Sequence, residues 1–189
     1  MGRWQPDAVQ RLQTAAMELF LERGYDGTTV ADIAERAQLT QRTFFRYFAD
    51  KREVLFLGSE EYETFVLNAV AAAAAADPLE AVVSAFEATA PVFFDHRADA
   101  VRRRYRVIQS NEELLERELK KAVRVTTGIT AALIRRGGDP TLAALAADVG
   151  SAVFRTAFDR WASGAEGSLI DGIRASLADL RRVMAGSQG

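Results

Sequence analysis

The side chains with the clearest chemical capability lie within residues 41–48, a short polar and aromatic segment. Arg42 and Arg46 are four residues apart, so both would lie on one face of a helix. Phe44 and Phe48 share that spacing and would pack inward. The side chains left facing outward are Gln41, Arg42, Phe45 and Arg46. Because Arg can bridge two acceptors on guanine and Gln can pair with adenine, this face could read base sequence in a DNA major groove.

Other chemistries are excluded by residue type. The 189-residue chain has no cysteine, which rules out disulfides, thiolate zinc sites, iron–sulfur clusters and cysteine nucleophiles. Its one histidine, His96, cannot form a two-histidine metal site and is expected in an exposed turn. No glycine-rich phosphate loop or hydrolase motif occurs. The glutamates of 112–118 are typical of a helix surface, where Glu113 and Glu116 each have a basic residue four positions on. We therefore expect no metal, no cofactor and no catalysis.

The distribution of charge favours a local rather than a general nucleic-acid contact. The chain carries 24 basic and 26 acidic residues, a net charge of -2, which argues against coating nucleic acid by bulk charge. Residues 36–52 hold five basic side chains and one acidic, giving +4. The only concentrated positive block thus coincides with the segment that could read DNA.

Helical spacing and punctuation predict an all-α fold. Pro6, Pro78 and Pro140 stand where helices would begin, and apolar residues recur at helical spacing without a sustained strand pattern. We expect a first helix ending at Arg23-Gly24, a short helix after Thr28-Thr29, a second short helix capped by Thr40, and a long helix capped by Asp50. Further helices are expected over 78–95, with Pro91 kinking or ending it, and over 98–109, 111–136, 140–163 and 168–184. No stretch approaches the ~18 apolar residues of a spanning helix, so we expect a cytoplasmic protein without a membrane.

Residues 8–55 resemble the DNA-binding domain of the TetR family of bacterial transcriptional regulators. The resemblance rests on three runs: Thr28-Thr29-Val30-Ala31-Asp32-Ile33-Ala34, Leu39 through Phe48, and Lys51-Arg52-Glu53-Val54-Leu55. It implies an N-terminal three-helix helix-turn-helix domain over 1–52, joined by a long helix to a helical-bundle ligand-binding and dimerisation domain over 53–189.

The same resemblance implies roles for individual residues. Thr29 would donate to a backbone phosphate together with exposed N–H groups at the start of its helix, and Tyr47 and Lys51 would hold flanking phosphates. The residues that would face the groove are Thr40, Gln41, Arg42, Thr43 and Arg46. Two positions depart from the family pattern: Phe45 replaces a common tyrosine and offers only apolar contact, and Gln38 replaces a common turn glycine. A positive φ at Gln38 would cost about 1 kcal/mol of strain.

The last two predicted helices are apolar on more than one face, which predicts a two-fold dimer interface. Its expected residues are Val149, Val153, Trp161, Ile173, Leu177 and Leu180. The alternative is that both faces are buried within one chain.

Aromatic residues gather before and within the central helices, where core packing is the more common role of any one of them. The family resemblance allows an effector pocket among them, since ligand pockets are apolar with few polar groups. The expected lining is Phe86, Phe93, Phe94, Tyr105, Gln109, Thr127, Phe154 and Phe158. The basic run Arg102-Arg103-Arg104 is most often a solvated face, although it could steer an anionic ligand such as an acyl-CoA or another fatty-acid derivative.

Together these features predict a homodimeric repressor that binds a pseudo-palindromic double-stranded DNA operator and is released by a small apolar, amphipathic or acyl-like effector. Two alternatives stay open at this point. The chain could be an all-α ligand carrier or small helical enzyme whose helix-turn-helix is only structural, or a DNA-binding regulator that answers to a partner protein instead of a ligand.

Overall fold

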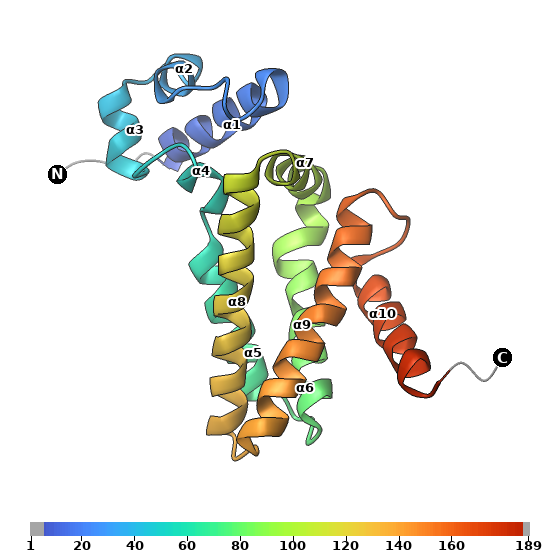
Figure 1. The fold of residues 1–189 in the computed structure, drawn as a ribbon. Coiled ribbons are helices and arrows are strands. Elements are labelled where there is room, and N and C mark those ends of the chain that lie inside the picture. The colour runs from blue at the N-terminus through green and yellow to red at the C-terminus, as the bar shows by residue number, and fades with distance from the viewer. Residues whose placement is uncertain (1–5, 187–189) are drawn as a thin grey trace. The chain divides into compact units, whose positions relative to one another are not determined.

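The computed structural model describes residues 6–186, and every regular element within that range is helical. The all-α prediction is therefore confirmed. The α-helices are α1 (Pro6–Arg23), α2 (Val30–Arg36), α3 (Gln41–Tyr47), α4 (Glu53–Phe56), α5 (Ser59–Ala72), α6 (Pro78–Thr89), α7 (Ala98–Gln109), α8 (Glu112–Arg135), α9 (Pro140–Ala162) and α10 (Leu169–Met184) (Figure 1).

The described chain forms two compact units. The N-terminal unit runs to Gly58 and includes Arg103–Glu116, and the second unit holds Ser59–Arg102 and the residues from Arg117 on. The sequence-based boundary at residue 52 assigned 103–116 to the C-terminal domain. Val107, Ile108 and Leu114 instead pack into the core of the N-terminal unit, which is why this distant segment belongs there.

The core of the N-terminal unit is built from the inward faces of short helices. Leu12, Ile33 and Phe44 are fully buried at its centre, and each comes from a different helix of the first three. The predicted inward packing of Phe44 and Phe48 is confirmed, since they are 0% and 3% exposed and their rings lie 5.4 Å apart. Helix α1 ends at Arg23, followed by Gly24 at φ +80°, a left-handed conformation that glycine adopts without strain.

The expected single long helix after Asp50 is wrong. Helix α4 ends at Phe56, Gly58 adopts φ +84°, and α5 begins at Ser59. Asp50 does accept hydrogen bonds from the backbone N–H groups of Arg52 and Glu53, as a helix-start residue should. The chain leaves the right-handed helical region at Leu57, with φ -58° and ψ 135°, and Gly58 continues the break.

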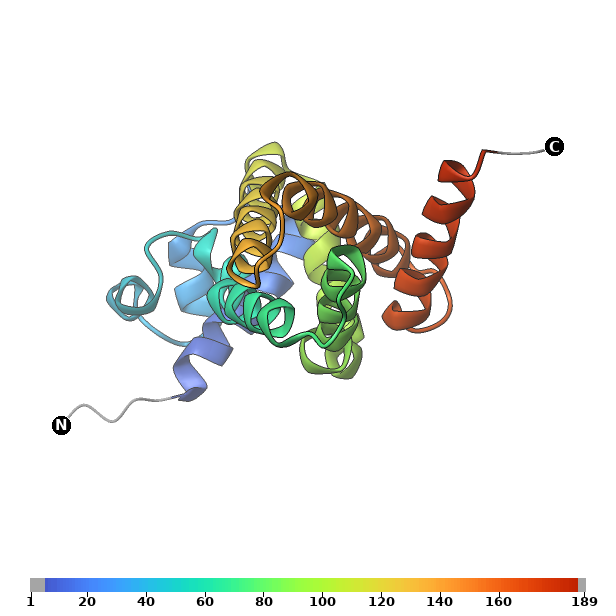
Figure 2. The ribbon, with the colours of Figure 1, turned by 90° about the horizontal axis from the view of Figure 1, so that it is seen from below.

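In the second unit, α9 packs against α6 and α10, and α5 also packs against α6 (Figures 1 and 2). Gly150 makes the α6–α9 approach possible, because a Cβ atom there would lie only 2.4 Å from Val82 Cγ1. Helix α9 is the one described helix long and apolar enough to cross a membrane by length and composition. One third of its most apolar stretch is buried, and α9 packs against α6 and α10.

Pro91 ends the regular α-helix as expected. Helix α6 stops at Thr89, and the chain continues through one π-helical turn, Ala90–Phe94, and a 3-10 turn, Asp95–Arg97. Proline lacks the N–H that the next helical hydrogen bond needs, and π-helical turns occur often at functional sites.

Candidate nucleic-acid interface

The start of the recognition helix α3 is set by its cap. The Oγ1 atom of Thr40 accepts a hydrogen bond from the backbone N–H of Thr43 at 3.1 Å, and the two hydroxyl oxygens lie 3.0 Å apart. The capping role predicted for Thr40 is confirmed. Both hydroxyls therefore lie at the helix end that enters the groove in helix-turn-helix proteins.

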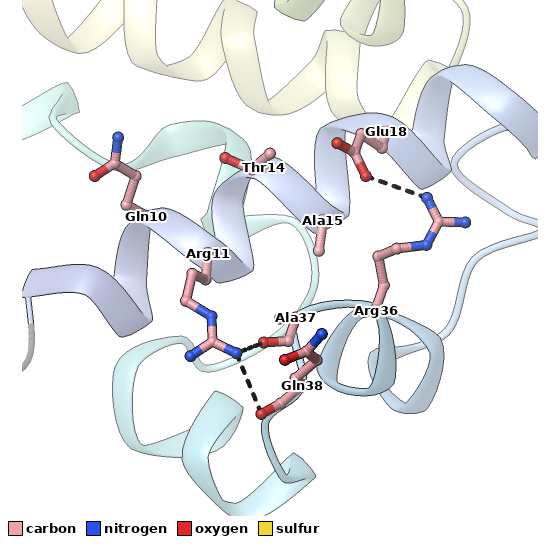
Figure 3. Close-up of a pocket in the computed structure, with 8 residues that line it drawn as sticks. All are labelled: Gln10, Arg11, Thr14, Ala15, Glu18, Arg36, Ala37 and Gln38. Carbon is pink, nitrogen blue, oxygen red and sulfur yellow. Dashed lines mark hydrogen bonds and ion pairs between the residues drawn. The ribbon is translucent and has the colours of Figure 1, made fainter.

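The turn before α3 holds a strained residue. Gln38 has φ +54°, as its replacement of a glycine predicted, so the turn carries about 1–2 kcal/mol of local strain. The backbone N–H of Gln38 donates to Glu35 O at 2.8 Å. Arg11 donates from its guanidinium to Ala37 O and Gln38 O and thereby ties the turn to α1 (Figure 3). This bracing offsets the strain and fixes the angle between α2 and α3.

The outward face of α3 carries the side chains that the spacing predicted. The exposed ones are Gln41, Arg42, Phe45 and Arg46. Phe45 is 56% exposed, far more than a core aromatic would be. Arg46 donates to the Tyr47 hydroxyl at 2.8 Å and lies over its ring, with Cζ 4.7 Å from the centroid. The Tyr47 oxygen acts as the acceptor, so its own proton stays available to a phosphate.

Most of the positive block is neutralised inside the unit. Arg36 pairs with Glu22 at 2.9 Å and with Glu18 at 3.2 Å, and Arg52 pairs with Asp50 at 2.7 Å. These pairs raise the pKa of both arginines and lower that of Asp50, mainly through side-chain hydrogen bonds. Within residues 6–186 the Arg42 side chain makes no ion pair or hydrogen bond. The cations available to DNA on this segment are therefore those of α3.

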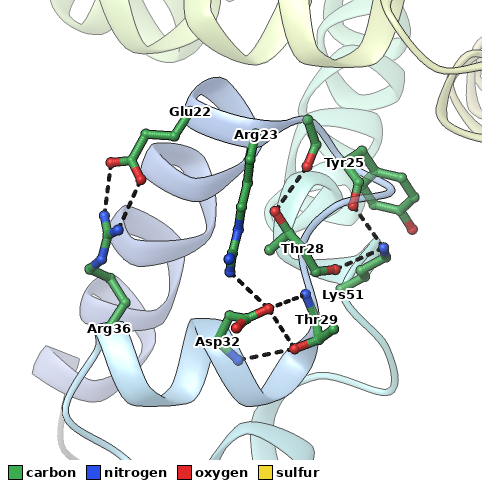
Figure 4. A network of polar contacts seen from close by, with 9 residues as sticks. Glu22, Arg23, Tyr25, Thr28, Thr29, Asp32, Arg36 and Lys51 are labelled. Atoms are coloured by element: carbon green, nitrogen blue, oxygen red, sulfur yellow. Dashed lines mark hydrogen bonds and ion pairs between the residues drawn. The ribbon is translucent and has the colours of Figure 1, made fainter.

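Lys51 has a structural position that sequence did not predict. Its Nζ donates to the carbonyl oxygens of Tyr25 at 2.8 Å and Thr28 at 2.9 Å and lies 4.1 Å from the Tyr25 ring centroid (Figure 4). Burial raises the pKa of the Tyr25 hydroxyl to about 12. Two of its three N–H donors therefore close the loop between α1 and α2, and a phosphate contact by Lys51 stays a prediction.

Thr29 is likewise engaged by its own helix. Its hydroxyl donates to Asp32 Oδ2 at 2.6 Å, its backbone N–H donates to the same oxygen at 2.8 Å, and its oxygen accepts from the Asp32 N–H at 3.2 Å. Hydrogen bonds from Thr29, together with Arg23 at 2.8 Å, lower the pKa of Asp32 to about 2. This capping box uses both donors of Thr29 and places a carboxylate beside them, and a phosphate contact by Thr29 stays a prediction.

A shallow hollow of about 620 Å³ lies on the N-terminal unit between α1 and the end of α2 (Figure 3). Its lining is polar and includes Gln10, Arg11, Glu18 and Arg36. It does not match the apolar effector pocket that sequence predicted. In the described part of the chain, no group of three or more His, Asp or Glu side chains is arranged to hold a metal ion.

The second unit brings five of the predicted pocket residues into one aromatic cluster. Phe86 stacks on Phe154 at 4.4 Å, and Phe94 lies 6.1 Å from Phe154 and 5.4 Å from Phe158. Phe93 joins the cluster through Phe94 at 6.4 Å.

Two of the other expected pocket residues are exposed. Gln109 belongs to the N-terminal unit, as does half-buried Tyr105. Thr127 is exposed on α8, where its hydroxyl donates to Val123 O.

Sequence reasoning missed the other members of the cluster. Tyr62 and Phe65 contact Phe93 at 5.4 and 5.3 Å, and Trp161 contacts Phe94 at 6.3 Å. Burial raises the pKa of the Tyr62 hydroxyl well above its ordinary value. The available signal was the helical spacing of Tyr62 and Phe65 on one face of α5.

The predicted dimer residues divide by burial. Val153, Trp161 and Ile173 are at most 5% exposed within the single chain, which leaves little of their surface for a partner, and their place in an interface stays a prediction. Val149, Leu177 and Leu180 are half-buried. Sequence reasoning missed the most exposed apolar residues of α9 and α10, which are Leu142, Leu145, Val183 and Met184.

A capped helix-turn-helix with an exposed polar and basic second helix, followed by a helical bundle, defines a DNA-binding regulator. Comparison with protein families agrees. Residues 12–56 match the bacterial regulatory proteins of the tetR family, and residues 76–185 match the MftR C-terminal domain. The chain belongs to the TetR family and is a DNA-binding transcriptional regulator.

Known relatives and structures are similar over different extents. The regulator TcmR of Streptomyces glaucescens is 34% identical over 122 residues, which cover 64% of this chain and 50% of TcmR. The chain thus spans about half the length of that relative and less of the others that it matches. A TetR-family structure from Syntrophomonas wolfei has a TM-score of 0.66 at 20% identity, covering 95% of this chain and 96% of that one. FadR of Thermus thermophilus, solved with lauroyl-CoA, has a TM-score of 0.50 at 23% identity, covering 96% and 97%.

Proposed function

We propose that this protein is a dimeric, effector-released repressor that reads a pseudo-palindromic operator with helix α3. Residues 1–52 would form the DNA-reading part, and residues 53–189 the ligand-binding and dimerisation part. The observation that carries the proposal is the outward face of α3, where Arg42 is free of intramolecular partners and Arg46 is exposed beside it.

Each exposed group of α3 has a distinct task in this proposal. Arg42 and Arg46 donate to guanine or to phosphate, Gln41 pairs with adenine, and Phe45 contacts a thymine methyl group. The hydroxyls of Thr40 and Thr43 lie at the leading end of the helix and reach the nearest base edges or phosphates. The Tyr47 hydroxyl donates to a flanking phosphate while accepting from Arg46.

Two copies are required because one short helix reads only a half-site. Two-fold symmetry places the two recognition helices about one DNA turn apart, roughly 34–36 Å or a multiple of it. Leu142 and Leu145 on α9 are 59% and 56% exposed, and half-buried Leu177 and Leu180 lie on α10. Exposed leucines on the last two helices support a partner surface there.

The dimer is tested by sedimentation of Leu145→Glu and Leu177→Glu variants. Both should sediment as monomers, because each places a charge in an apolar contact. Leu21→Glu on α1 is the matched control, since Leu21 is also exposed, at 42%, and should leave the dimer intact. Dimers that survive both α9 and α10 substitutions would place the interface elsewhere.

Regulation requires an effector that binds the two conformations of the protein with different affinity, since equal affinity would shift nothing. The aromatic cluster of the second unit supports a small apolar or amphipathic effector, and the fold neighbour FadR holds lauroyl-CoA. A regulator of this kind works in the cytoplasm, where its operator lies.

The repressor assignment is tested by transcription in vitro from the promoter upstream of the protein's own gene. Added protein should lower the transcript level in a dose-dependent way, and Arg42→Ala together with Arg46→Ala should relieve that effect. An increase in transcript would make the protein an activator. No effect and no DNA complex would favour the ligand carrier, in which the helix-turn-helix only supports the fold.

A further inference from the structure

We propose that Arg102 is the anchor for a carboxylate group on the effector, and that the effector is therefore an apolar acid rather than a neutral or cationic molecule. This rests on the proposed function and specifies the chemical class of its ligand. The residues that carry it, Arg102, Phe94, Phe158 and Trp161, all belong to the second unit.

Arg102 is half-buried, and its guanidinium contains one donor that is shielded from solvent. Its Nε is shielded from solvent and has no hydrogen-bond partner, and its guanidinium lies over the Trp161 ring with Cζ 5.2 Å from the centroid. Among the described residues no carboxylate pairs with it. A buried N–H donor without an acceptor is uncommon in folded proteins, and one at a guanidinium calls for an anionic or carbonyl acceptor that completes the site.

The neighbouring arginines differ from Arg102 in hydrogen bonding or in exposure. Arg97 donates from Nε to Phe93 O at 2.7 Å, and Arg104 donates to Leu55 O at 2.6 Å. Arg103 is exposed to solvent. Arg102 is thus the arginine of this run whose Nε–H is both buried and unused, so the run is more than a uniformly solvated basic face.

Aromatic rings provide the apolar part of the site. Trp161 contacts Phe94 at 6.3 Å and Phe158 at 6.0 Å, and Phe94 and Phe158 are only half-buried. Phe94 is the last residue of the π-helical turn Ala90–Phe94. Half-buried rings beside an unpartnered guanidinium suit a ligand with an apolar body and one anionic end.

The sign of the ligand charge follows from the same contacts. A cationic ligand would be repelled by Arg102 and would compete with it for the face of Trp161. A neutral ligand would leave the guanidinium charge uncompensated. A carboxylate can accept from Nε and one terminal nitrogen in parallel, the geometry in which arginine binds carboxylates most strongly.

Binding is tested by calorimetry with octanoate and 2-naphthoate, each compared with its own neutral carboxamide. At least one acid should bind about 10- to 100-fold more tightly than its amide, the range expected for a charged hydrogen-bonded pair. Arg102→Gln should abolish that preference. Arg103→Gln removes the same charge one residue away from an exposed position and should retain it.

Further variants separate recognition from folding. Arg102→Lys keeps the charge without the planar pair of donors, so its acid preference should fall between wild type and Arg102→Gln. The emission of Trp161, isolated by a Trp4→Phe substitution, should change with octanoate and not with octanamide. Equal loss in Arg102→Gln and Arg103→Gln, or no preference for either acid, would overturn the proposal.

Failure here is distinguishable from failure of the regulator itself. DNA binding without ligand should be the same in Arg102→Gln and wild type, because the variant changes only the effector site. Intact DNA binding with no acid preference would refute the anchor alone, whereas loss of DNA binding in the wild-type protein would refute the proposed function.

Discussion

Replacing Lys51 by methionine tests whether its ammonium group closes the loop between α1 and α2, a contact called here the loop clasp, or instead contacts a DNA phosphate. Methionine retains the apolar stem and removes the ammonium group that donates to Tyr25 O at 2.8 Å and Thr28 O at 2.9 Å. Hydrogen bonds from a charged donor contribute about 1.5–3 kcal/mol each, but both are only part-buried and Tyr25 O keeps the Thr28 N–H at 3.2 Å. We therefore expect the free energy of unfolding to fall by about 2 kcal/mol in total.

Urea unfolding measures this loss, and the midpoint should fall by about 1 M for an m-value of roughly 2 kcal/mol/M. Arg135→Met, at an exposed position on α8, is the control for loss of one charge and should change stability by no more than about 0.5 kcal/mol. The salt dependence of DNA binding should stay the same in both variants. The loop clasp would be refuted if Lys51→Met left stability unchanged. A phosphate role would be supported if the variant also reduced the slope of log DNA affinity against log salt concentration by about 0.9 per lost phosphate contact.

Other expectations follow from single positions. Gly150→Ala should lower the unfolding free energy by about 1–3 kcal/mol, because its Cβ would meet Val82 at 2.4 Å. Gly172→Ala, whose Cβ would have its nearest atom at 3.7 Å, should be neutral or stabilising. Equal effects of the two variants in thermal unfolding would contradict this packing. Gln38→Gly should raise stability by about 1 kcal/mol in urea by relieving the positive φ, and a loss would show that the turn is unstrained. The pKa of Asp32 is lowered from 3.8 to about 2, so the ionised carboxylate contributes to stability above pH 4 and this contribution is lost as the pH falls toward 2. Asp32→Asn should lack this acid-dependent loss of stability. Identical profiles of stability against pH in the wild type and the variant would refute the contribution of Asp32.

Features that depend on neighbouring residues were predictable from sequence. The cap at Thr40 was expected, and its side chain accepts the backbone N–H of Thr43. Helices also begin at Pro78 and Pro140, as these prolines predicted. The strained turn at Gln38 was also expected, since it follows from a side chain at a position that favours glycine. Local backbone chemistry decides such features, so one chain suffices to find them.

Features that depend on distant partners were not predictable. Lys51 contacts carbonyls 23 and 26 residues earlier, and Arg36 pairs with carboxylates 14 and 18 residues earlier. Helical periodicity places Val153 and Ile173 on apolar helix faces, but it cannot tell whether the chain's own helices or a partner will cover those faces. Arg102 illustrates the same limit, because its unused Nε becomes evident only beside Trp161.

Neutralisation within the N-terminal unit also changes how the charge count should be interpreted. The +4 block predicted a local electrostatic contact, and within that block ion pairs and carbonyl contacts engage Arg36, Lys51 and Arg52. DNA affinity should consequently depend on few charges and on base contacts. The slope of log affinity against log salt concentration should be modest for each subunit.

The most direct test of DNA reading by α3 is footprinting on the DNA upstream of the protein's own gene, with wild type, Arg42→Ala and Arg46→Ala compared at matched salt. The wild type should protect a pseudo-palindromic site, and each variant should lose about 1–3 kcal/mol of specific binding and relax base preference at its own position in each half-site. A site bound with unchanged affinity and sequence preference by both variants would show that α3 does not read the operator.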